Sequence, residues 1–164
     1  MIRLFVSNSL TPNKAFSLDE KALHYLLHVM RLKQDDQILC FNGQVGEWCA
    51  RLDIRSKKSV SVIPQKQIRL QKTPEFLAIC PALIKKDNFD FVLQKATEIG
   101  VTDIYPLITD HTVHAHFNKM HADLIVQEAA EQSERLTLPT IHEPIQLQQI
   151  KKNITYRLHH LLLS

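Results

Sequence analysis

The first half of the chain alternates short apolar runs with polar turns, a pattern typical of a small antiparallel sheet. Strands are predicted over 37–41 and 47–54, on either side of a turn, and the period-two alternation of Val60 and Val62 with serines predicts a third over 59–64. The dipeptide Asn42-Gly43 predicts a turn after the first strand, and the residues that follow favour a longer hairpin loop. Several short strands and one helix in about 70 residues predict a small β-barrel.

The helix of this half is predicted over Ser17 to Arg31. Ser17 is the predicted N-cap, and Glu20, three residues later, completes a capping box. The helix would bury one apolar stripe. That stripe consists of Leu23, Leu26, Leu27 and Met30.

From Pro74 onward the pattern changes to alternating strands and helices, after a polar, basic stretch over 65–73 that is the predicted linker. The predicted elements are a strand within 76–84, a helix over 87–99 followed by Gly100, a strand over 101–108, a helix from Asn118 to Leu136, a strand over 140–142 and a short helix over 145–152. This order begins a parallel α/β sheet and leaves it unfinished.

Composition excludes several classes of protein. The 164 residues include three glycines, Gly43, Gly46 and Gly100, which cannot form a phosphate loop or a dinucleotide fingerprint. The longest apolar run, residues 76–84, is broken by Pro81 and is far shorter than a membrane span. Residues 1–10 do not have the pattern of a secretory signal, so a cytosolic protein is expected. Three cysteines without Cys-x-x-Cys spacing are expected to be reduced core residues.

Charge divides the chain into two different halves. Residues 1–72 contain 12 Lys and Arg against 6 Asp and Glu, whereas residues 73–164 contain 8 against 11. A basic excess of six on one segment is typical of a phosphate-binding surface, and many solvated surfaces have the same composition. Charge alone therefore leaves both interpretations of the first half open.

Three stretches then carry a resemblance to a known family. The first is Val29-Met30-Arg31, with Asp36 and Phe41-Asn42-Gly43. The second is Lys85, Asp87, Asp90 and the run Leu93 to Val101, ending in Pro106. The third is Glu128 to Ser133, with Arg135 and Pro139. In this order and spacing they resemble the ribosomal RNA small subunit methyltransferase E (RsmE) family, the 16S rRNA uracil-N3 methyltransferases.

The resemblance implies a fold of mixed α+β and α/β class. A PUA-like RNA-binding β-barrel would occupy 1–72, and the first half of a SPOUT-type parallel α/β domain would occupy 73–164. It also implies transfer of a methyl group from S-adenosyl-L-methionine to N3 of a uridine in the 16S rRNA of the small ribosomal subunit. Family members are usually homodimers.

The resemblance also supplies candidate site residues. The expected RNA contacts are Arg3, Arg31, Lys33, Lys57 and Lys58, and the expected catalytic residues are Lys85, Glu98 and Arg135. Each has a simpler interpretation: Arg31 would end its helix favourably, Lys85 and Glu98 would be solvated, and Glu131 would form a surface ion pair with Arg135 at helical spacing.

Departures from the family pattern limit what is expected of the chain. The family continues into a knotted segment with a Gly-Pro-Glu-Gly-Gly loop that holds the cofactor, and nothing up to Ser164 matches it. We therefore expect the cofactor-binding residues outside this sequence and little activity from the chain alone. A non-catalytic RNA-binding remnant and a decayed gene product are the alternatives. Four histidines lie within 111–121, but no cysteine lies near them, and no metal site is predicted.

Overall fold

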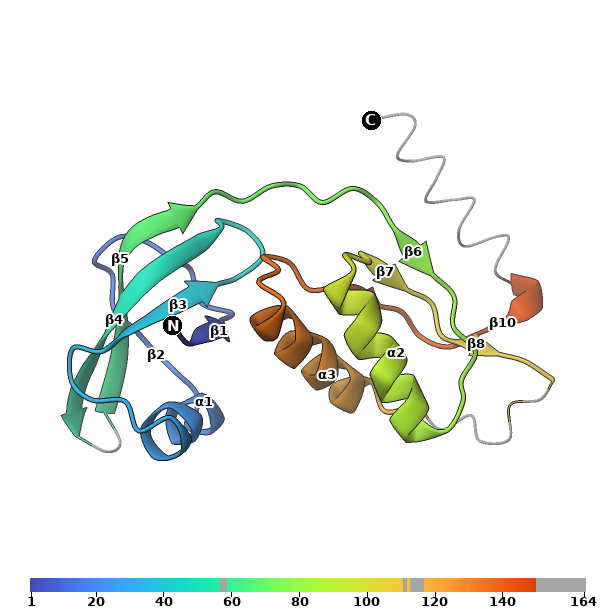
Figure 1. Ribbon diagram of the computed structural model, residues 1–164, viewed down its shortest axis with the longest axis horizontal. Coiled ribbons are helices and arrows are strands. Elements are labelled where there is room, and N and C mark those ends of the chain that lie inside the picture. The colour runs from blue at the N-terminus through green and yellow to red at the C-terminus, as the bar shows by residue number, and fades with distance from the viewer. Residues whose placement is uncertain (57–58, 111, 113–116, 150–164) are drawn as a thin grey trace. The chain divides into compact units, whose positions relative to one another are not determined.

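The chain forms two compact units, each with its own apolar core. The first unit comprises Met1–Thr73 together with Ala130–Thr137, and the second comprises Pro74–Ala129 and the chain from Leu138 onward. No pattern in the sequence assigned residues 130–137 to the N-terminal unit. The computed structural model describes residues 1–56, 59–110, 112 and 117–149 (Figure 1).

A five-stranded sheet forms the first unit. Its order is β1-β3-β4-β5-β2, with β1 and β3 parallel and the other neighbours antiparallel. Register shifts along the β4–β5 hairpin bend it, so the predicted barrel takes the form of a curled half-barrel sheet (Figure 1). The strands are β1 (Arg3–Phe5), β2 (Phe16–Ser17), β3 (Gln37–Phe41), β4 (Glu47–Ser56) and β5 (Ser59–Arg69).

Alternate residues of the central strands form the core of this unit, as the period-two pattern predicted. The bounds predicted for β3 are confirmed, but β5 continues five residues beyond Pro64 because Arg69 still pairs with Glu47 of β4. The first part of the predicted linker is therefore strand. The buried core side chains include Ile38, Cys40, Ala50, Leu52, Val60 and Val62.

The predicted N-terminal helix is present but shorter and irregular. It consists of α1 (Glu20–His24) followed by a π-helical turn, η1 (Tyr25–Val29). The predicted cap, Ser17, is wrong because this residue pairs with β5 as part of β2; Asp19 caps the helix by accepting from the amide of Ala22 at 2.7 Å. Leu26 is fully buried, whereas Met30, expected in the buried stripe, is 39% exposed.

The second unit contains parallel strands that prolines interrupt. The sheet β6-β7-β9 pairs Ile79 with Ile104 and Ile104 with Ile141, and a second pair, β8 with β10, follows further along. Pro81 and Pro106 lie between the two sets, and their carbonyls accept from the next strand in each case. The single strand predicted over 101–108 is therefore two short strands. These elements are β6 (Ala78–Ile79), β7 (Asp103–Ile104), β8 (Leu107–Ile108), β9 (Thr140–Ile141) and β10 (Ile145–Gln146).

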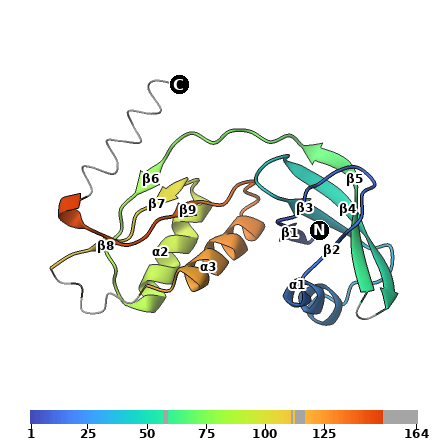
Figure 2. The ribbon, with the colours of Figure 1, turned by 180° about the vertical axis from the view of Figure 1, so that it is seen from behind.

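Two helices cover one face of this sheet. Figures 1 and 2 show α2 (Lys86–Glu98) and α3 (Lys119–Gln132) on the same side, where Phe89, Leu93 and Val126 pack against the strand isoleucines.

The ends of these helices match the predictions only in part. Gly100 follows α2 with a φ of 100°, and the predicted cap Asn118 accepts from the amide of His121 at 3.0 Å, as expected. However, α3 ends four residues before the predicted Leu136. The predicted helix from Ile145 is a strand followed by one 3-10 turn, η2 (Leu147–Gln149), in its described part.

The structure can be compared with two predictions made from composition, that the cysteines are reduced and that the chain contains no membrane span. All three cysteines are free, and burial raises the pKa of the Cys40 thiol to about 12, so that this residue behaves as a neutral core side chain. Among the described residues, no helix has the length and apolar character required to cross a bilayer.

Candidate functional site

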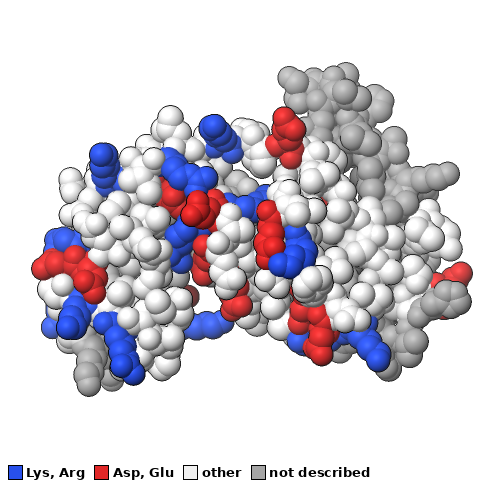
Figure 3. Space-filling view, viewed as in Figure 1, with Lys and Arg blue, Asp and Glu red and all other residues white. Residues whose placement is uncertain are grey.

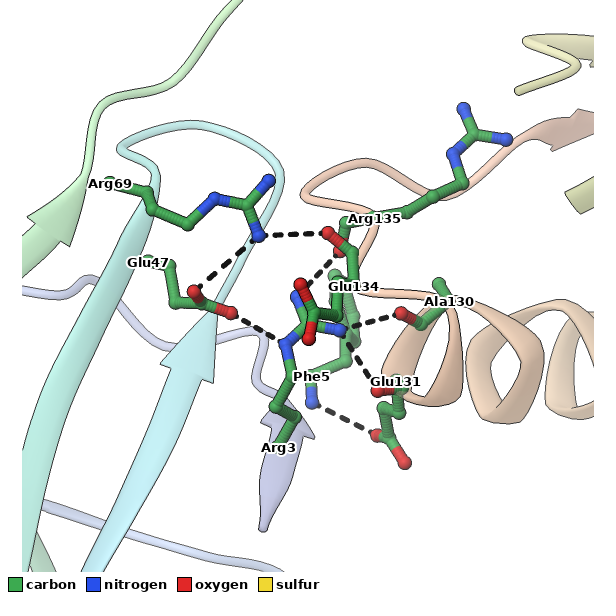
Figure 4. A network of polar contacts seen from close by, with 8 residues as sticks. All are labelled: Arg3, Phe5, Glu47, Arg69, Ala130, Glu131, Glu134 and Arg135. Atoms are coloured by element: carbon green, nitrogen blue, oxygen red, sulfur yellow. Dashed lines mark hydrogen bonds and ion pairs between the residues drawn. The ribbon is translucent and has the colours of Figure 1, made fainter. Parts of the chain in front are cut away.

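Arg3 is buried in the first unit and donates hydrogen bonds to several groups (Figure 4). Its Nε donates to Oε1 of Glu47 at 2.6 Å. Its Nη1 donates to the carbonyls of Ala130 and Glu131 at 2.7 and 2.9 Å, and Nη2 donates to the carbonyl of Arg135 at 2.9 Å. All three guanidinium nitrogens therefore have acceptors within the unit.

Glu47 extends this network to a second arginine. Its side chain is 3% exposed, and Oε2 lies 3.6 Å from Nη1 of Arg69. Arg69 also donates to the carbonyl of Glu134 at 3.0 Å. The guanidinium carbon of Arg3 lies 4.5 Å from the centroid of the Phe41 ring, a cation–π contact. The buried carboxylate thus has a cation on each oxygen.

The location of the acceptors explains why an arginine suits this position. The last four carbonyls of a helix have no partner within it, and the C-terminal end carries negative partial charge. The helix α3 ends at Gln132, and Glu134 then turns the chain with a φ of 59°. Arg3 caps this end from another part of the sequence. The RNA contact predicted for Arg3 does not fit a side chain that is 7% exposed.

Arg135, a predicted catalytic residue, and Glu131, its predicted ion-pair partner, also belong to this region. Oε1 of Glu131 accepts from the amide of Phe5 at 2.9 Å, an interaction with β1 that helical spacing did not suggest. The side chain of Arg135 points away from Arg3 in Figure 4, and its Nη2 donates to Oγ1 of Thr137 at 3.3 Å. Partial burial lowers the pKa of the Arg135 guanidinium. The network therefore holds the backbone carbonyl of Arg135, while the guanidinium of Arg135 lies away from Arg3.

The remaining predicted RNA contacts lie on the surface of the first unit where they are described. Arg31 and Lys33 are exposed, and the amide of Lys33 donates to Oδ2 of Asp36 at 2.7 Å. Lys57 and Lys58 lie outside the described residues. On the face shown in Figure 3, basic and acidic side chains lie among one another over this unit, so no large area of one sign is seen from that side.

The predicted catalytic residues of the second unit are separated by the length of a helix. Lys85 precedes α2 at the carboxyl edge of the parallel sheet, where such folds bind ligands. Glu98 ends α2 and pairs with Lys95 at 2.8 Å. Thirteen residues of helix separate them by about 20 Å. The two cannot act on one reacting atom.

The histidines that invited a metal interpretation are only partly described. His111, His114 and His116 lie outside the described residues. Nε2 of His121 lies 2.8 Å from Oδ2 of Asp90. Burial opposes ionisation of this carboxyl, but hydrogen bonds from Lys86 and His121 lower its pKa overall. Within the described part of the chain, no group of three His, Cys, Asp or Glu is placed to hold a metal ion.

One polar cluster of the second unit was missed from the sequence. Nε2 of His142 lies 2.8 Å from Oδ1 of Asp103, which is 4% exposed. The imidazole stacks on the Tyr105 ring, with centroids 4.0 Å apart. Burial lowers the pKa of His142 and raises that of Tyr105. The sequence did contain a signal for this cluster. Asp103, Tyr105 and His142 alternate with Ile104 and Ile141, so they lie on the face of the sheet opposite the helices.

Comparisons with known proteins agree with this two-part fold. A family model described as an RNA methyltransferase domain matches residues 71–163, and one described as an RNA methyltransferase PUA domain matches residues 18–65. The chain therefore belongs to the RNA methyltransferase family that joins these two domains, and its relatives include ribosomal RNA small subunit methyltransferase E.

Two such relatives show how much of the family's length is present. The Ribosomal RNA small subunit methyltransferase E of Rickettsia conorii is 35% identical over 92% of this chain and 63% of the relative. That of Synechocystis is 32% identical over 93% of this chain and 50% of the relative. The chain thus spans about half to two thirds of the relatives it matches.

Solved structures show the same fold. A methyltransferase from Legionella pneumophila, solved with its cofactor SAM, is 26% identical, with a TM-score of 0.83 over 93% of this chain and 66% of that one. A Ribosomal RNA small subunit methyltransferase E from Neisseria gonorrhoeae, bound to S-adenosyl methionine, has a TM-score of 0.82 at 24% identity over 93% of this chain and 65% of that one.

Proposed function

We propose that this protein is an rRNA methyltransferase that transfers a methyl group from S-adenosyl-L-methionine to N3 of a uridine in 16S rRNA. The match to both the methyltransferase domain and its PUA domain carries the proposal. The relatives named ribosomal RNA small subunit methyltransferase E support the choice of substrate. The proposed partners are the small ribosomal subunit and a second copy of the chain, and the proposed location is the cytoplasm, where ribosomes are modified.

The proposed division of labour follows the two predicted domains. The N-terminal domain, over 1–72, binds RNA, and the α/β domain, over 73–164, contributes residues to the site of methyl transfer. N3 of uridine lies on the pairing edge, so the base must be unpaired and presented to the site. N3 is also a weak nucleophile until its proton leaves. The enzyme's main contribution is therefore to hold the freed base in line with the methyl donor.

The described residues that fit a substrate role lie at the carboxyl edge of the parallel sheet. Lys85 is exposed there, and Thr109 and Thr112 form a turn after β8, with the amide of Thr109 donating to Oγ1 of Thr112 at 2.9 Å. We propose that Lys85 contacts an RNA phosphate or the uracil, and that Arg135 is a second RNA-contacting cation. Glu98 lies at the other end of α2 and is left out of this proposal.

The same edge does not by itself fit the cofactor. Among the described residues it offers the cation of Lys85 and the hydroxyls of Thr109 and Thr112, with the exposed Asp110 in the same turn, whereas the sulfonium is itself cationic. The three glycines, which allow a backbone to approach a ligand closely, lie elsewhere, two in the β3–β4 loop and one after α2. We therefore propose this edge as an RNA contact and not as the cofactor site.

A methyl-transfer assay tests the proposal. The protein is incubated with tritiated S-adenosyl-L-methionine and small ribosomal subunits that lack the modification, and primer extension locates the product, because a methyl group on N3 blocks base pairing. Because the cofactor-binding residues are expected outside this sequence, we expect little incorporation from the 164-residue chain alone. In a longer form that carries the family's cofactor loop, we expect incorporation at one uridine, and at least a tenfold loss for Lys85→Met against Lys14→Met, a surface lysine of the first unit. RNA binding by the longer form without methyl transfer would favour the non-catalytic alternative. Absence of both would contradict the proposal.

A further inference from the structure

The helical segment of the first unit exposes aromatic and basic side chains together. Leu26 is fully buried, and Leu23 and Leu27 pack against the core, so the other side of the helix faces solvent. We call these outward residues the α1–η1 surface. Its members are Lys21, His24, Tyr25, His28, Arg31 and Lys33, all exposed.

Aromatic rings gather on this surface. The imidazoles of His24 and His28 lie against each other, with centroids 5.0 Å apart and an angle of 36° between the rings. Tyr25 lies next to them and is 39% exposed. The turn is π-helical, with the amide of Met30 donating to the carbonyl of Tyr25 at 2.9 Å. Such turns are rare and are frequent at functional sites.

Arg31 ends this turn in a conformation that suits glycine better. Its φ is 55°, in the left-handed region, and the amide of Leu32 that follows donates to the carbonyl of Leu26 at 2.9 Å. Glycine ends helices in this way without steric cost. An arginine here carries a conformational cost that glycine would avoid, which makes the position a candidate functional site.

Basic residues outnumber acidic ones between Glu20 and Lys33. No Asp or Glu occurs between Lys21 and Lys33, and the exposed Glu20 lies just before this run, one helical turn from His24. Three other flanking carboxylates have partners: Asp19 accepts from the amide of Ala22, Asp36 accepts from the amide of Lys33, and Asp35 pairs with Arg51. Exposed rings beside cations are the combination that binds single-stranded nucleic acid, through base stacking and phosphate contacts.

We propose that the α1–η1 surface binds unpaired nucleotides of the RNA substrate. The rings of His24, Tyr25 and His28 stack on bases, and the cations of Lys21, Arg31 and Lys33 contact phosphates. The inference rests on the proposed function, because it takes RNA as the substrate, and it adds a second place at which an unpaired segment is held.

A ring-deletion variant tests the stacking. Fluorescence anisotropy measures binding of the full chain to a labelled ten-nucleotide oligouridine and to an abasic ribose-phosphate strand of equal length. Loss of stacking on one base corresponds to about tenfold. We expect H24A/Y25A/H28A to weaken oligouridine binding at least tenfold and to leave abasic binding within twofold. Phe91→Ala, which removes an exposed ring of the second unit, is the matched control and should change neither.

Arg31→Gly tests the charge without disturbing the backbone, since glycine suits a φ of 55°. We expect an unchanged or higher melting temperature, weaker binding to both strands, and a salt-dependence slope lower by about 0.7.

Equal RNA affinity of wild type and variants would overturn the inference. So would a change confined to the oligomeric state by light scattering, which would make the surface a protein contact. If a longer form with the family's cofactor loop methylates ribosomal subunits but the chain binds no oligouridine, the inference fails and the proposed function stands. If neither methyl transfer by the longer form nor oligouridine binding is seen, both fail.

Discussion

Glu47 shows how much one residue can depend on distant parts of the chain. The sequence places it at the start of a strand, as an ordinary acidic residue after a glycine. The structure buries it between Arg3 and Arg69, with a side-chain exposure of 3%. Breaking a buried pair by removing one partner leaves an uncompensated charge, which costs far more than the loss of a surface pair. The network is therefore sensitive at its carboxylate.

We predict that Glu47→Gln destabilises the first unit by about 3 kcal/mol, because the Arg3 guanidinium would stay buried without a counter-charge. Urea unfolding followed by the fluorescence of Trp48, the only tryptophan, measures the change. Asp35→Asn is the matched control: it removes a carboxylate from the exposed pair with Arg51 and should cost less than about 1 kcal/mol. Equal effects of the two changes would mean that the Glu47 pair is no more than a surface contact.

The sequence predicted some residues of the candidate site and not others. The positions of Arg31, Lys33 and Lys85 on the surface followed from local pattern and resemblance. The partners of Arg3 did not, because its carboxylate lies 44 residues away and its carbonyl acceptors 127 to 132 residues away. Backbone acceptors also leave no mark in the sequence, since any residue supplies a carbonyl.

The β3–β4 loop also makes a contact with a distant strand that the sequence did not predict. Asn42 and Gly43 indicated a turn, and Oδ1 of Asn42 does accept from the amides of Gln44 and Val45. The pattern did not show that Gly46 lies directly against β5. A Cβ at Gly46 would lie 2.1 Å from the carbonyl oxygen of Arg69, whereas one at Gly43 would meet nothing closer than 3.7 Å.

We predict that Gly46→Ala costs more stability than Gly43→Ala. Both residues have a positive φ, 80° and 76°, so both changes carry the strain of a left-handed alanine, about 1 kcal/mol. Only Gly46→Ala also forces the strand backbone to move, which adds roughly 2 kcal/mol. Thermal unfolding of the two variants measures the difference. Similar melting temperatures would mean that the loop moves away from β5 without cost.

Elements with a strong local signal were predicted well. The bounds of β3 followed from an apolar run that ends at the Asn42-Gly43 turn, and the position of α2 followed from the helical spacing of its apolar residues. The π-helical turn was not predicted, since a shift of one hydrogen bond leaves the same leucines buried. Pro81, Pro106 and Pro144 mark the places where the parallel strands are interrupted, because proline has no amide to donate to a neighbouring strand. The apolar runs around Pro81 and Pro106 were nevertheless interpreted as continuous strands.

The first unit is discontinuous in sequence. It combines Met1–Thr73 with Ala130–Thr137, so α3 begins in the second unit and its last residues belong to the first. The bonds that Arg3 and Phe5 make to residues 130–135 hold this returning segment. A boundary after residue 72 is therefore an incomplete description of the first unit.

We predict that Arg3→Met frays the end of α3. The carbonyls of Ala130 and Glu131 would lose the donor that caps them, and helix ends without caps open more often. Hydrogen–deuterium exchange of the full chain should show amides in 129–134 exchanging roughly tenfold faster, with α2 unchanged. Arg69→Met removes one hydrogen bond, to the carbonyl of Glu134, and the longer ion pair with Glu47, from a side chain that is 45% exposed, and leaves the helix carbonyls capped by Arg3, so it should produce a smaller change. Unchanged exchange in Arg3→Met would show that the helix end is held by its own packing, and that the buried arginine mainly neutralises Glu47.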